Sequence, residues 1–305
     1  MIKKHWLPVT IIFASCLIWL GIFYICQPQA KQVDGVVAPA DFKKRSFIEK
    51  KSATQTPPIN HLAVVLDKNQ PTAAKLKSVE LIPDNLSELD QQAILDFIKD
   101  SPNGTGEYVV KNNLMNRLVA QNKPMPGQSA ALIAIASNKN QDIVVRAYAV
   151  QHLRPLYERS GDVAIKDFFY KALLEEDSEV SGGAMLALNY LMNQDEYGPV
   201  FDRAPVIQQA KKIALNDTAN NNNRITAIQV ASVEKDPELA DCLRKIISDE
   251  NSHPALRISA IAGLGTIGDE SDIAALKVIA QSKNFEKRAA HAAIKKISNR
   301  RSIIR

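Results

Sequence analysis

The chain has 305 residues, a formal net charge of +5, only 12 glycines and 6% aromatic residues. Few glycines and aromatics beside plentiful alanine, leucine and isoleucine favour helices and argue against a β-sandwich or barrel. The three cysteines, Cys16, Cys26 and Cys242, have no spacing typical of a disulfide framework or a zinc site, which excludes both classes.

The first notable element is an uncharged apolar run over residues 7–26. About 20 such residues are enough for a helix to cross the roughly 30 Å hydrocarbon core of a bilayer. We therefore predict a transmembrane helix, with residues 1–26 as an uncleaved signal anchor. A cleaved signal peptide stays open as an alternative, although no small-x-small site follows Cys26. Lipidation at Cys16 stays open too, although the apolar run continues ten residues beyond it.

The basic residues that flank this run predict its orientation. Lys3 and Lys4 precede it, and only Lys31 lies within the next 15 residues. Because basic flanks stay in the cytoplasm, we expect a single-pass protein of the inner (plasma) membrane. Its N-terminus would be cytoplasmic and its body periplasmic or otherwise extracytoplasmic. The basic run at 43–45 weighs against this orientation.

Residues 27–85 are expected to form an irregular linker, since they contain six of the 15 prolines. The basic segment 43–51 is either a solvated part of this linker or a contact for anionic lipid headgroups. Two short apolar stretches, 61–66 and 77–82, are predicted to be strands. At least one of them should pack along the first helices of the domain that follows.

From residue 86 to 305, apolar residues recur at helical spacing and predict a series of helical pairs. Ser87 is expected to cap the first helix, and a turn over 101–106 should end it. The asparagines at 220–223 are predicted to form a turn and a helix cap. The expected pairs are 87–100 with 108–120, 127–138 with 142–154, 162–175 with 179–192, 204–216 with 222–232, 237–249 with 254–265, and 271–282 with 286–298.

The clearest pair lies between residues 254 and 282. Leu256, Ala260 and Leu264 follow one another at i, i+4 and i+8 and make an apolar stripe. Gly265 and Gly268 suit the positive φ of a helix exit and turn, so we expect the first helix to end there.

A repeated position gives the pairs a common register. Arg257 is followed by alanine three residues later and leucine seven residues later, and similar triplets begin at Arg146, Ser181, Arg224 and Lys287. The steps between them are 35, 43, 33 and 30 residues, which is typical of helical-pair repeats. Lys111, 35 residues before Arg146, is a degenerate further member.

This pattern resembles the HEAT repeat family, especially its short PBS-lyase-like bacterial subtype. The resemblance covers roughly residues 86–298 and is carried by Asn251–Gly268, Asp142–Leu153 and Glu179–Leu191. It implies an all-α fold: an α-solenoid of about six HEAT-like helical pairs, preceded by the transmembrane helix and the irregular linker. One pair cannot bury its own faces, so it needs neighbours on both sides.

The residue patterns of common catalytic and cofactor sites are missing. No two of the five histidines have a metal-ligand spacing, and there is no His–Glu dipeptide, the motif that iron-binding hydroxylases on this scaffold use. No nucleophilic-serine motif occurs, and the Gly104–Gly106 stretch lacks a phosphate-loop pattern. We therefore expect no catalytic residue, metal or cofactor. Gly182 and Gly183 should instead allow the close approach of a neighbouring helix or of a partner's backbone.

The repeated basic residues allow two interpretations. In the family that the chain resembles, this position pairs with an acid or a loop carbonyl of the adjacent pair, which makes an internal ladder. The candidate acids here are Asp142, Asp177, Asp217 and Asp249. Alternatively, the cations form a stripe on the concave face that grips an acidic peptide, interrupted at Ser181. The candidate partner-binding residues are then Arg146, Arg224, Arg257 and Lys287.

The leading hypothesis for function is a non-catalytic, membrane-anchored scaffold that holds a protein or peptide on the concave face formed by the second helices. One rival is an enzyme related to bilin (tetrapyrrole) lyases, which the name of the subtype suggests. The other is a nucleic-acid binder. It is disfavoured because residues 86–294 contain 22 basic and 27 acidic residues, too acidic a balance for a phosphate-binding groove. No small-molecule substrate is expected.

Overall fold

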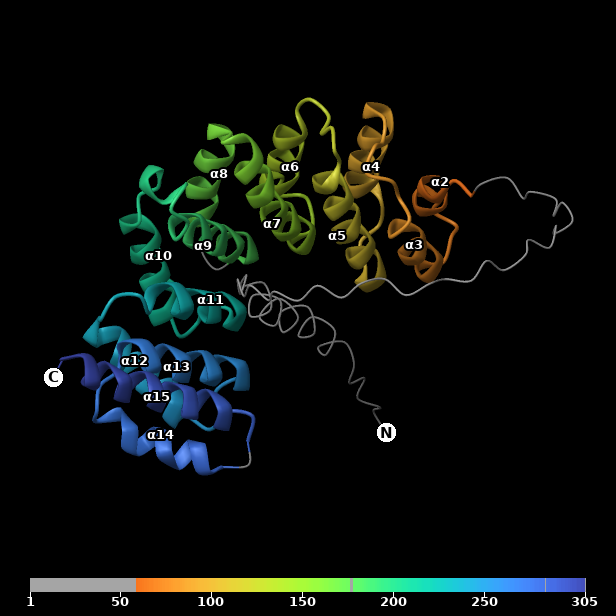
Figure 1. Ribbon diagram of the computed structural model, residues 1–305. Coiled ribbons are helices and arrows are strands. Elements are labelled where there is room, and N and C mark those ends of the chain that lie inside the picture. The colour runs from red at the N-terminus through yellow and green to blue at the C-terminus, as the bar shows by residue number, and fades with distance from the viewer. Residues whose placement is uncertain (1–58, 176–177, 283, 305) are drawn as a thin grey trace, which may run out of the picture. The chain divides into compact units, whose positions relative to one another are not determined.

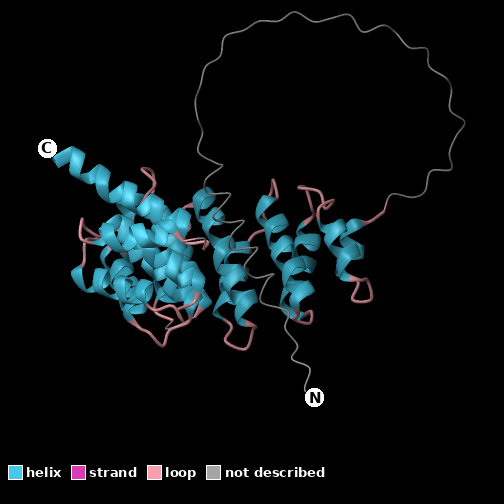
Figure 2. Cartoon of the chain, turned by 90° about the horizontal axis from the view of Figure 1, so that it is seen from below, coloured by secondary structure: helices cyan, strands magenta, loops and turns pink. Residues whose placement is uncertain are grey.

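A computed structural model describes residues 59–175, 178–282 and 284–304. These residues form fourteen α-helices and one short 3-10 helix, with no strand among them (Figures 1 and 2). The prediction of an all-α chain is confirmed for this part. The predicted transmembrane helix at 7–26 lies outside the described residues. Within them, no helix is both long and apolar enough to cross a membrane.

The helices form seven consecutive pairs. The first helices of the pairs are α2 (His61–Leu66), α4 (Glu88–Asp100), α6 (Gln128–Ser137), α8 (Val163–Leu173), α10 (Ala204–Leu215), α12 (Pro237–Ser248) and α14 (Asp272–Gln281). The second helices are α3 (Thr72–Val79), α5 (Thr105–Ala120), α7 (Ile143–Ser160), α9 (Glu179–Met192), α11 (Asn221–Ala231), α13 (Pro254–Ile267) and α15 (Lys287–Ile304).

The pairs stack so that each second helix packs against the second helices before and after it, from α3 to α15. Consecutive first helices touch less extensively, so the second helices form the more closely packed layer. We call it the second-helix layer. Figure 1 shows α5, α7 and α9 lying side by side in this layer. The apolar core lies between the two layers and includes Ile94, Leu153 and Leu264, all 2% exposed or less.

The predicted strands at 61–66 and 77–82 are wrong. The first segment is helix α2, and the second covers the end of α3 and the turn after it. Asn60 caps α2 by accepting from the Ala63 amide at 3.1 Å, and Leu62 and Val65 are buried on one helical face. The predicted linker therefore contains a seventh pair. Its packing on the solenoid is confirmed, since α3 lies against α5 and α2 against α4.

Three predicted helix starts hold because capping side chains act locally, whereas α5 begins three residues earlier and α7 ends six residues later than predicted. The Ser87 hydroxyl accepts from the Asp90 amide at 3.1 Å, Asp142 accepts from Val144 at 2.8 Å, and Asn220 accepts from Asn222 at 2.8 Å. These bonds satisfy amides of the first turn that have no intrahelical partner. The predicted helix cap is confirmed at Asn220, whereas residues 221–223 already belong to α11 and do not form a separate turn.

The prediction that Gly265 and Gly268 end a helix with positive φ is wrong. α13 continues through Gly265 to Ile267, and Gly268 has φ −66° rather than a positive value. A Cβ added at Gly265 would lie 2.8 Å from the Cα of Ala293 in α15. The glycine therefore serves the close packing of α13 on α15, not a helix exit. Among the described glycines, positive φ occurs at Gly127 and Gly161.

The expected close approach at Gly182 and Gly183 is confirmed on both sides of α9. A Cβ on Gly182 would lie 2.5 Å from Oδ1 of Asn223 in α11. A Cβ on Gly183 would lie 3.3 Å from Cγ1 of Val150 in α7. The two glycines thus fit α9 between its neighbours in the second-helix layer, which offsets the roughly 1 kcal/mol that a helical glycine costs.

Candidate functional site

The repeated position of the second helices faces the interior between the layers. At this position in α5, α7, α9 and α11, side chains of different chemistry donate to a backbone carbonyl at the C-terminal end of the first helix of their own pair. Such carbonyls have no intrahelical partner. The bonds are Lys111 Nζ to Ser101 O at 2.9 Å, Arg146 Nε to Ala136 O at 2.8 Å, Ser181 Oγ to Leu173 O at 3.0 Å, and Arg224 Nη2 to Ala214 O at 3.4 Å.

Arg146 also joins its pair to the next one. Its Nη2 lies 2.8 Å from both carboxylate oxygens of Glu175, which follows α8. Lys139 reaches the same carboxylate at 2.5 Å. Burial raises the pKa of Glu175, but the hydrogen bonds from Lys139 and Arg146 outweigh it and hold the pKa below its usual value. Arg146 itself is 5% exposed, so this ion pair is largely internal.

Arg257 makes the equivalent link at the C-terminal end of the stack. Its Nε lies 3.3 Å from Oε1 of Glu286, a carboxylate that is itself buried. The acids that bridge adjacent pairs are therefore Glu175 and Glu286, each 29 residues after its arginine. Of the expected partners, Asp142 instead accepts from the Tyr108 hydroxyl and caps α7. Asp249 accepts hydrogen bonds from Ser252 and Asn251, and the charge of Arg257 adds to them in lowering the pKa of Asp249. The direct ion pair of Arg257 is nevertheless with Glu286, from the loop after the next first helix. This geometry favours the internal ladder for these arginines.

Lys287 does not belong to this set. Arg146, Arg224 and Arg257 are each the fourth residue of their helix, whereas Lys287 is the first residue of α15 and is exposed. The fourth residue of α15 is Ala290, which is fully buried. The structure thus brings the three arginines into one interior row and leaves Lys287 apart from it. No contact of the described residues tests their proposed role in partner binding.

The accessible surface of the second-helix layer lies at other offsets, which the sequence analysis missed. Counted from the repeated position, residues two, five and nine places later are partly or fully exposed in five successive second helices. None of these residues is charged, although 23% of the chain is. We call this surface the uncharged face. Its members are Asn113, Asn116 and Ala120 on α5, Tyr148, Gln151 and Pro155 on α7, Gly183, Leu186 and Tyr190 on α9, Thr226, Gln229 and Val233 at α11, and Ser259, Ala262 and Thr266 on α13.

Charged groups lie at the margins of the uncharged face. The guanidinium of Arg154 lies 4.1 Å from the ring centroid of Tyr190 and 3.6 Å from Glu158. At the N-terminal ends of the helices, the Tyr108 hydroxyl donates to Asp142 at 2.7 Å, which raises the pKa of Tyr108 to about 12. Burial, and then the Asp142 charge, raise the pKa of the Glu179 carboxyl. The centre of the face can therefore exchange hydrogen bonds with a partner that carries no charge of its own.

His152 is a structural link beneath this face. Its Nε2 lies 2.9 Å from Oδ1 of Asn112 in the preceding second helix, and burial lowers the pKa of His152 to about 4. The imidazole is therefore neutral near pH 7, as expected for the packed helix residue that the sequence analysis favours. The described residues hold no group of three or more His, Cys, Asp or Glu placed to bind a metal.

Comparisons with known proteins find one family model that matches part of the chain. Residues 207–295 match the family described as HEAT repeats. Human deoxyhypusine hydroxylase in complex with glycerol is similar at 14% identity and a TM-score of 0.34, over 78% of this chain and 95% of that chain. An engineered protein is similar at 16% identity and a TM-score of 0.43, over 79% and 98%. Escherichia coli YibA is similar at 15% identity and a TM-score of 0.44, over 83% and 99%.

No curated protein matches this sequence. The matched range runs from α10 to α15 and contains the repeated arginines 224 and 257, whose helices pack as successive pairs. Residues 207–295 are therefore similar to HEAT repeats, and they lie within an all-α stack of helical pairs.

Proposed function

We propose that this chain is a non-catalytic scaffold that binds an extended segment of another protein along its uncharged face. The observation that carries the proposal is the absence of charge at fifteen equivalent accessible positions of α5 to α13. A surface with no role in binding would be free to carry charges, as most protein surfaces do. A surface that contacts a neutral polypeptide would not gain from them.

The chemistry of the face suits the backbone of a peptide. Primary amides such as Asn116, Gln151 and Gln229 both donate and accept hydrogen bonds, as the peptide group does. Helices of one layer lie about 8–10 Å apart, and an extended chain advances about 3.3 Å per residue. A bound strand would thus meet a new helix about every third residue. Tyr148 and Tyr190 add rigid aromatic surface, which is enriched where proteins bind one another.

Membrane anchoring is part of the same proposal and is supported by the sequence of residues 7–26. In it, the span holds the scaffold at the inner membrane, with the body on the extracytoplasmic side. Removing residues 1–26 should release the chain from the membrane fraction into the soluble fraction. If the shortened chain stays with the membrane, the anchor is misassigned.

Site-specific photocrosslinking in the membrane of the source cells tests the binding face. A photoreactive phenylalanine analogue replaces Gln151 or Gln229 on the uncharged face. In matched controls it replaces Gln92 or Gln208, which are equally exposed on the first helices α4 and α10. We expect one protein adduct, identified by mass spectrometry, from positions 151 and 229 only.

Further variants and controls test the proposal. The double variant Gln151→Ala/Gln229→Ala should lose the adduct formed from a probe at Asn116 and keep its melting temperature, because both side chains are exposed. Adducts of equal yield from the first-helix positions, or none from the uncharged face, would overturn the assignment. Variants at Arg224 and Arg257 should still form the same adducts. This result would show that the partner binds the uncharged face and does not depend on the interior arginines.

A further inference from the structure

The last helix carries a basic face that neither the scaffold function nor the fold requires. Lys287, His291 and Lys295 follow one another at i, i+4 and i+8 on α15, with Arg288 beside them, and all four are exposed. The opposite face of α15 is apolar and buried, through Ala290, Ala293 and Ile297. α15 contains no acidic residue. None of these four side chains lies within ion-pair distance of a carboxylate among the described residues.

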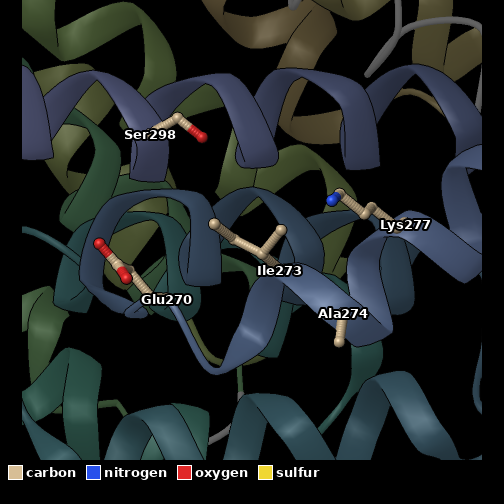
Figure 3. A pocket seen from close by; sticks show the side chains of 5 residues that line it. All are labelled: Glu270, Ile273, Ala274, Lys277 and Ser298. Atoms are coloured by element: carbon tan, nitrogen blue, oxygen red, sulfur yellow. The ribbon is translucent and has the colours of Figure 1, made fainter.

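Two apolar side chains of the α14–α15 pair are also exposed. Phe285, in the turn before α15, is 93% exposed, and Val278 on α14 is 71% exposed. Phe285 is the most exposed large apolar side chain among the described residues, and only Phe285 and Leu89, at 84%, are more exposed than Val278. The groove between α14 and α15, about 370 Å³ in volume, is lined by one cation, Lys277, and one carboxylate, Glu270 (Figure 3).

We infer that the α14–α15 pair docks on an anionic lipid surface, with the basic face of α15 against the headgroups and Phe285 inserted between them. Charge complementarity supports the occupant, because exposed cations that make no ion pair within the described part of the protein are attracted to negatively charged headgroups. The exposed apolar residues favour a lipid over a nucleic acid as the ligand. A phosphate backbone offers Val278 no apolar partner, whereas the upper acyl region of a bilayer receives both valine and phenylalanine.

This docking is separate from the anchor expected at residues 7–26, because it lies at the other end of the chain. It also lies outside the uncharged face, which ends at α13. Two attachment points would hold the stack along the membrane instead of leaving it free on its linker. Failure of the docking would leave the proposed partner-binding face untouched.

Tryptophan fluorescence of the full-length chain in reconstituted vesicles tests the inference. Trp6 and Trp19 are the two tryptophans of the chain. Replacing both by phenylalanine, together with Phe285→Trp, places a single probe at the tip of the patch. The vesicles contain phosphatidylcholine alone or with added phosphatidylglycerol. We expect a blue shift of the emission only in the anionic vesicles. It should be lost at about 0.5 M salt, where the Debye length falls to a few Å.

Matched variants separate this effect from general adsorption. Reversal of Lys287, Arg288 and Lys295 to glutamate should abolish the shift. The same reversal at Lys123, Lys171 and Lys245, three exposed lysines of other pairs, should leave it intact. A single tryptophan at Leu174, which is 68% exposed on another pair, should show no shift. Circular dichroism melting confirms that each variant is folded, which surface positions should permit.

Three results would overturn the inference. An equal shift in neutral vesicles would show adsorption through Phe285 without recognition of charge. The absence of a shift in anionic vesicles would show that this surface does not bind lipid. No shift with lipid, but a salt-sensitive change of tryptophan emission on adding double-stranded DNA, would assign the basic face to a nucleic acid instead.

Discussion

At the scale of single residues, the repeated position shows that four successive pairs share a hydrogen bond to a backbone carbonyl, whether or not the donor is charged. Lysine, arginine and serine occupy it, and each donates to a carbonyl at the end of the preceding helix. Arginine adds an ion pair to the next repeat where a glutamate is available, as at Arg146 with Glu175. The position therefore joins layers and neighbouring pairs with one side chain.

Arg146→Ala should lower the free energy of unfolding by about 2–4 kcal/mol. The change leaves the buried Ala136 carbonyl without this donor and removes one of the two cations on Glu175. Lys287→Ala, at an exposed position outside the row, should change it by less than about 0.5 kcal/mol. Urea denaturation of both variants measures the difference, and similar values for the two would contradict the ladder.

His152 predicts a pH dependence of stability. Its pKa is about 4 in the folded protein, against a usual 6.5, because burial disfavours the charged form. Above about pH 6.5 the group is neutral in both states and costs nothing. As the pH falls from 6.5 to 4, only the unfolded chain gains the proton, so stability falls by up to roughly 3 kcal/mol. Denaturation curves at pH 7 and pH 4 measure the loss.

The matched variant for this test is His152→Gln, which keeps a side-chain amide near Asn112 and does not titrate. Its own stability is expected to be lower, but its loss between pH 7 and pH 4 should be smaller than that of the unchanged chain. An equal loss in both proteins would assign the acid sensitivity to other groups.

At the scale of helices, the second-helix layer depends on small residues at particular places. Gly265→Ala should destabilise the protein by about 1–2 kcal/mol. The new Cβ meets backbone of α15 at 2.8 Å, and the strain exceeds the roughly 1 kcal/mol gained in helix propensity. Gly183→Ala is the matched control, since its Cβ meets only a valine methyl at 3.3 Å.

For Gly183→Ala we expect a change within about 1 kcal/mol, because propensity and crowding nearly cancel there. Thermal melting of both variants provides the comparison. A Gly265→Ala protein as stable as the unchanged chain would show that α13 and α15 can move apart without cost, and that the glycine has no packing role.

At the scale of the whole molecule, stability comes from neighbouring pairs, since one pair cannot bury both of its faces. The α2–α3 pair takes part in this. Lys75, 3% exposed on α3, lies 3.1 Å from Glu107 of α5, and Arg117 of α5 donates to the Val79 and Glu80 carbonyls of α3. Residues 59–85 thus cover the first face of the stack that begins at α4.

A chain shortened to begin at residue 59 should keep the melting temperature of the full body. A chain that begins at residue 86 should melt several degrees lower and unfold with a smaller m value, because it exposes the face that α3 covers. Calorimetry and urea denaturation measure both quantities. Equal melting temperatures would show that α2 and α3 lie on the stack without stabilising it.

The local pattern alone determined the helical pairs from residue 86 onward. Apolar spacing and capping residues such as Ser87, Asp142 and Asn220 act within one turn of the chain, so they can be read without knowing what packs where. The pair at 61–79 was not predicted because its helices have only 6 and 8 residues, and the second of them has no side-chain cap. A short apolar run is compatible with a strand or a helix, and here packing against a neighbouring helix such as α5 selects the helix.

Only the tertiary structure decided what the repeated residues do. Gly265 could serve a turn or a close approach, and the position of Ala293 in another helix makes it the latter. Arg146 could face a partner or the interior, and the carbonyl and glutamate that it meets lie 10 and 29 residues away. The uncharged face could be identified only when the second helices were aligned in the structure and the exposure of each residue was known. A side chain's surroundings depend on distant segments, which the periodicity of one helix does not specify.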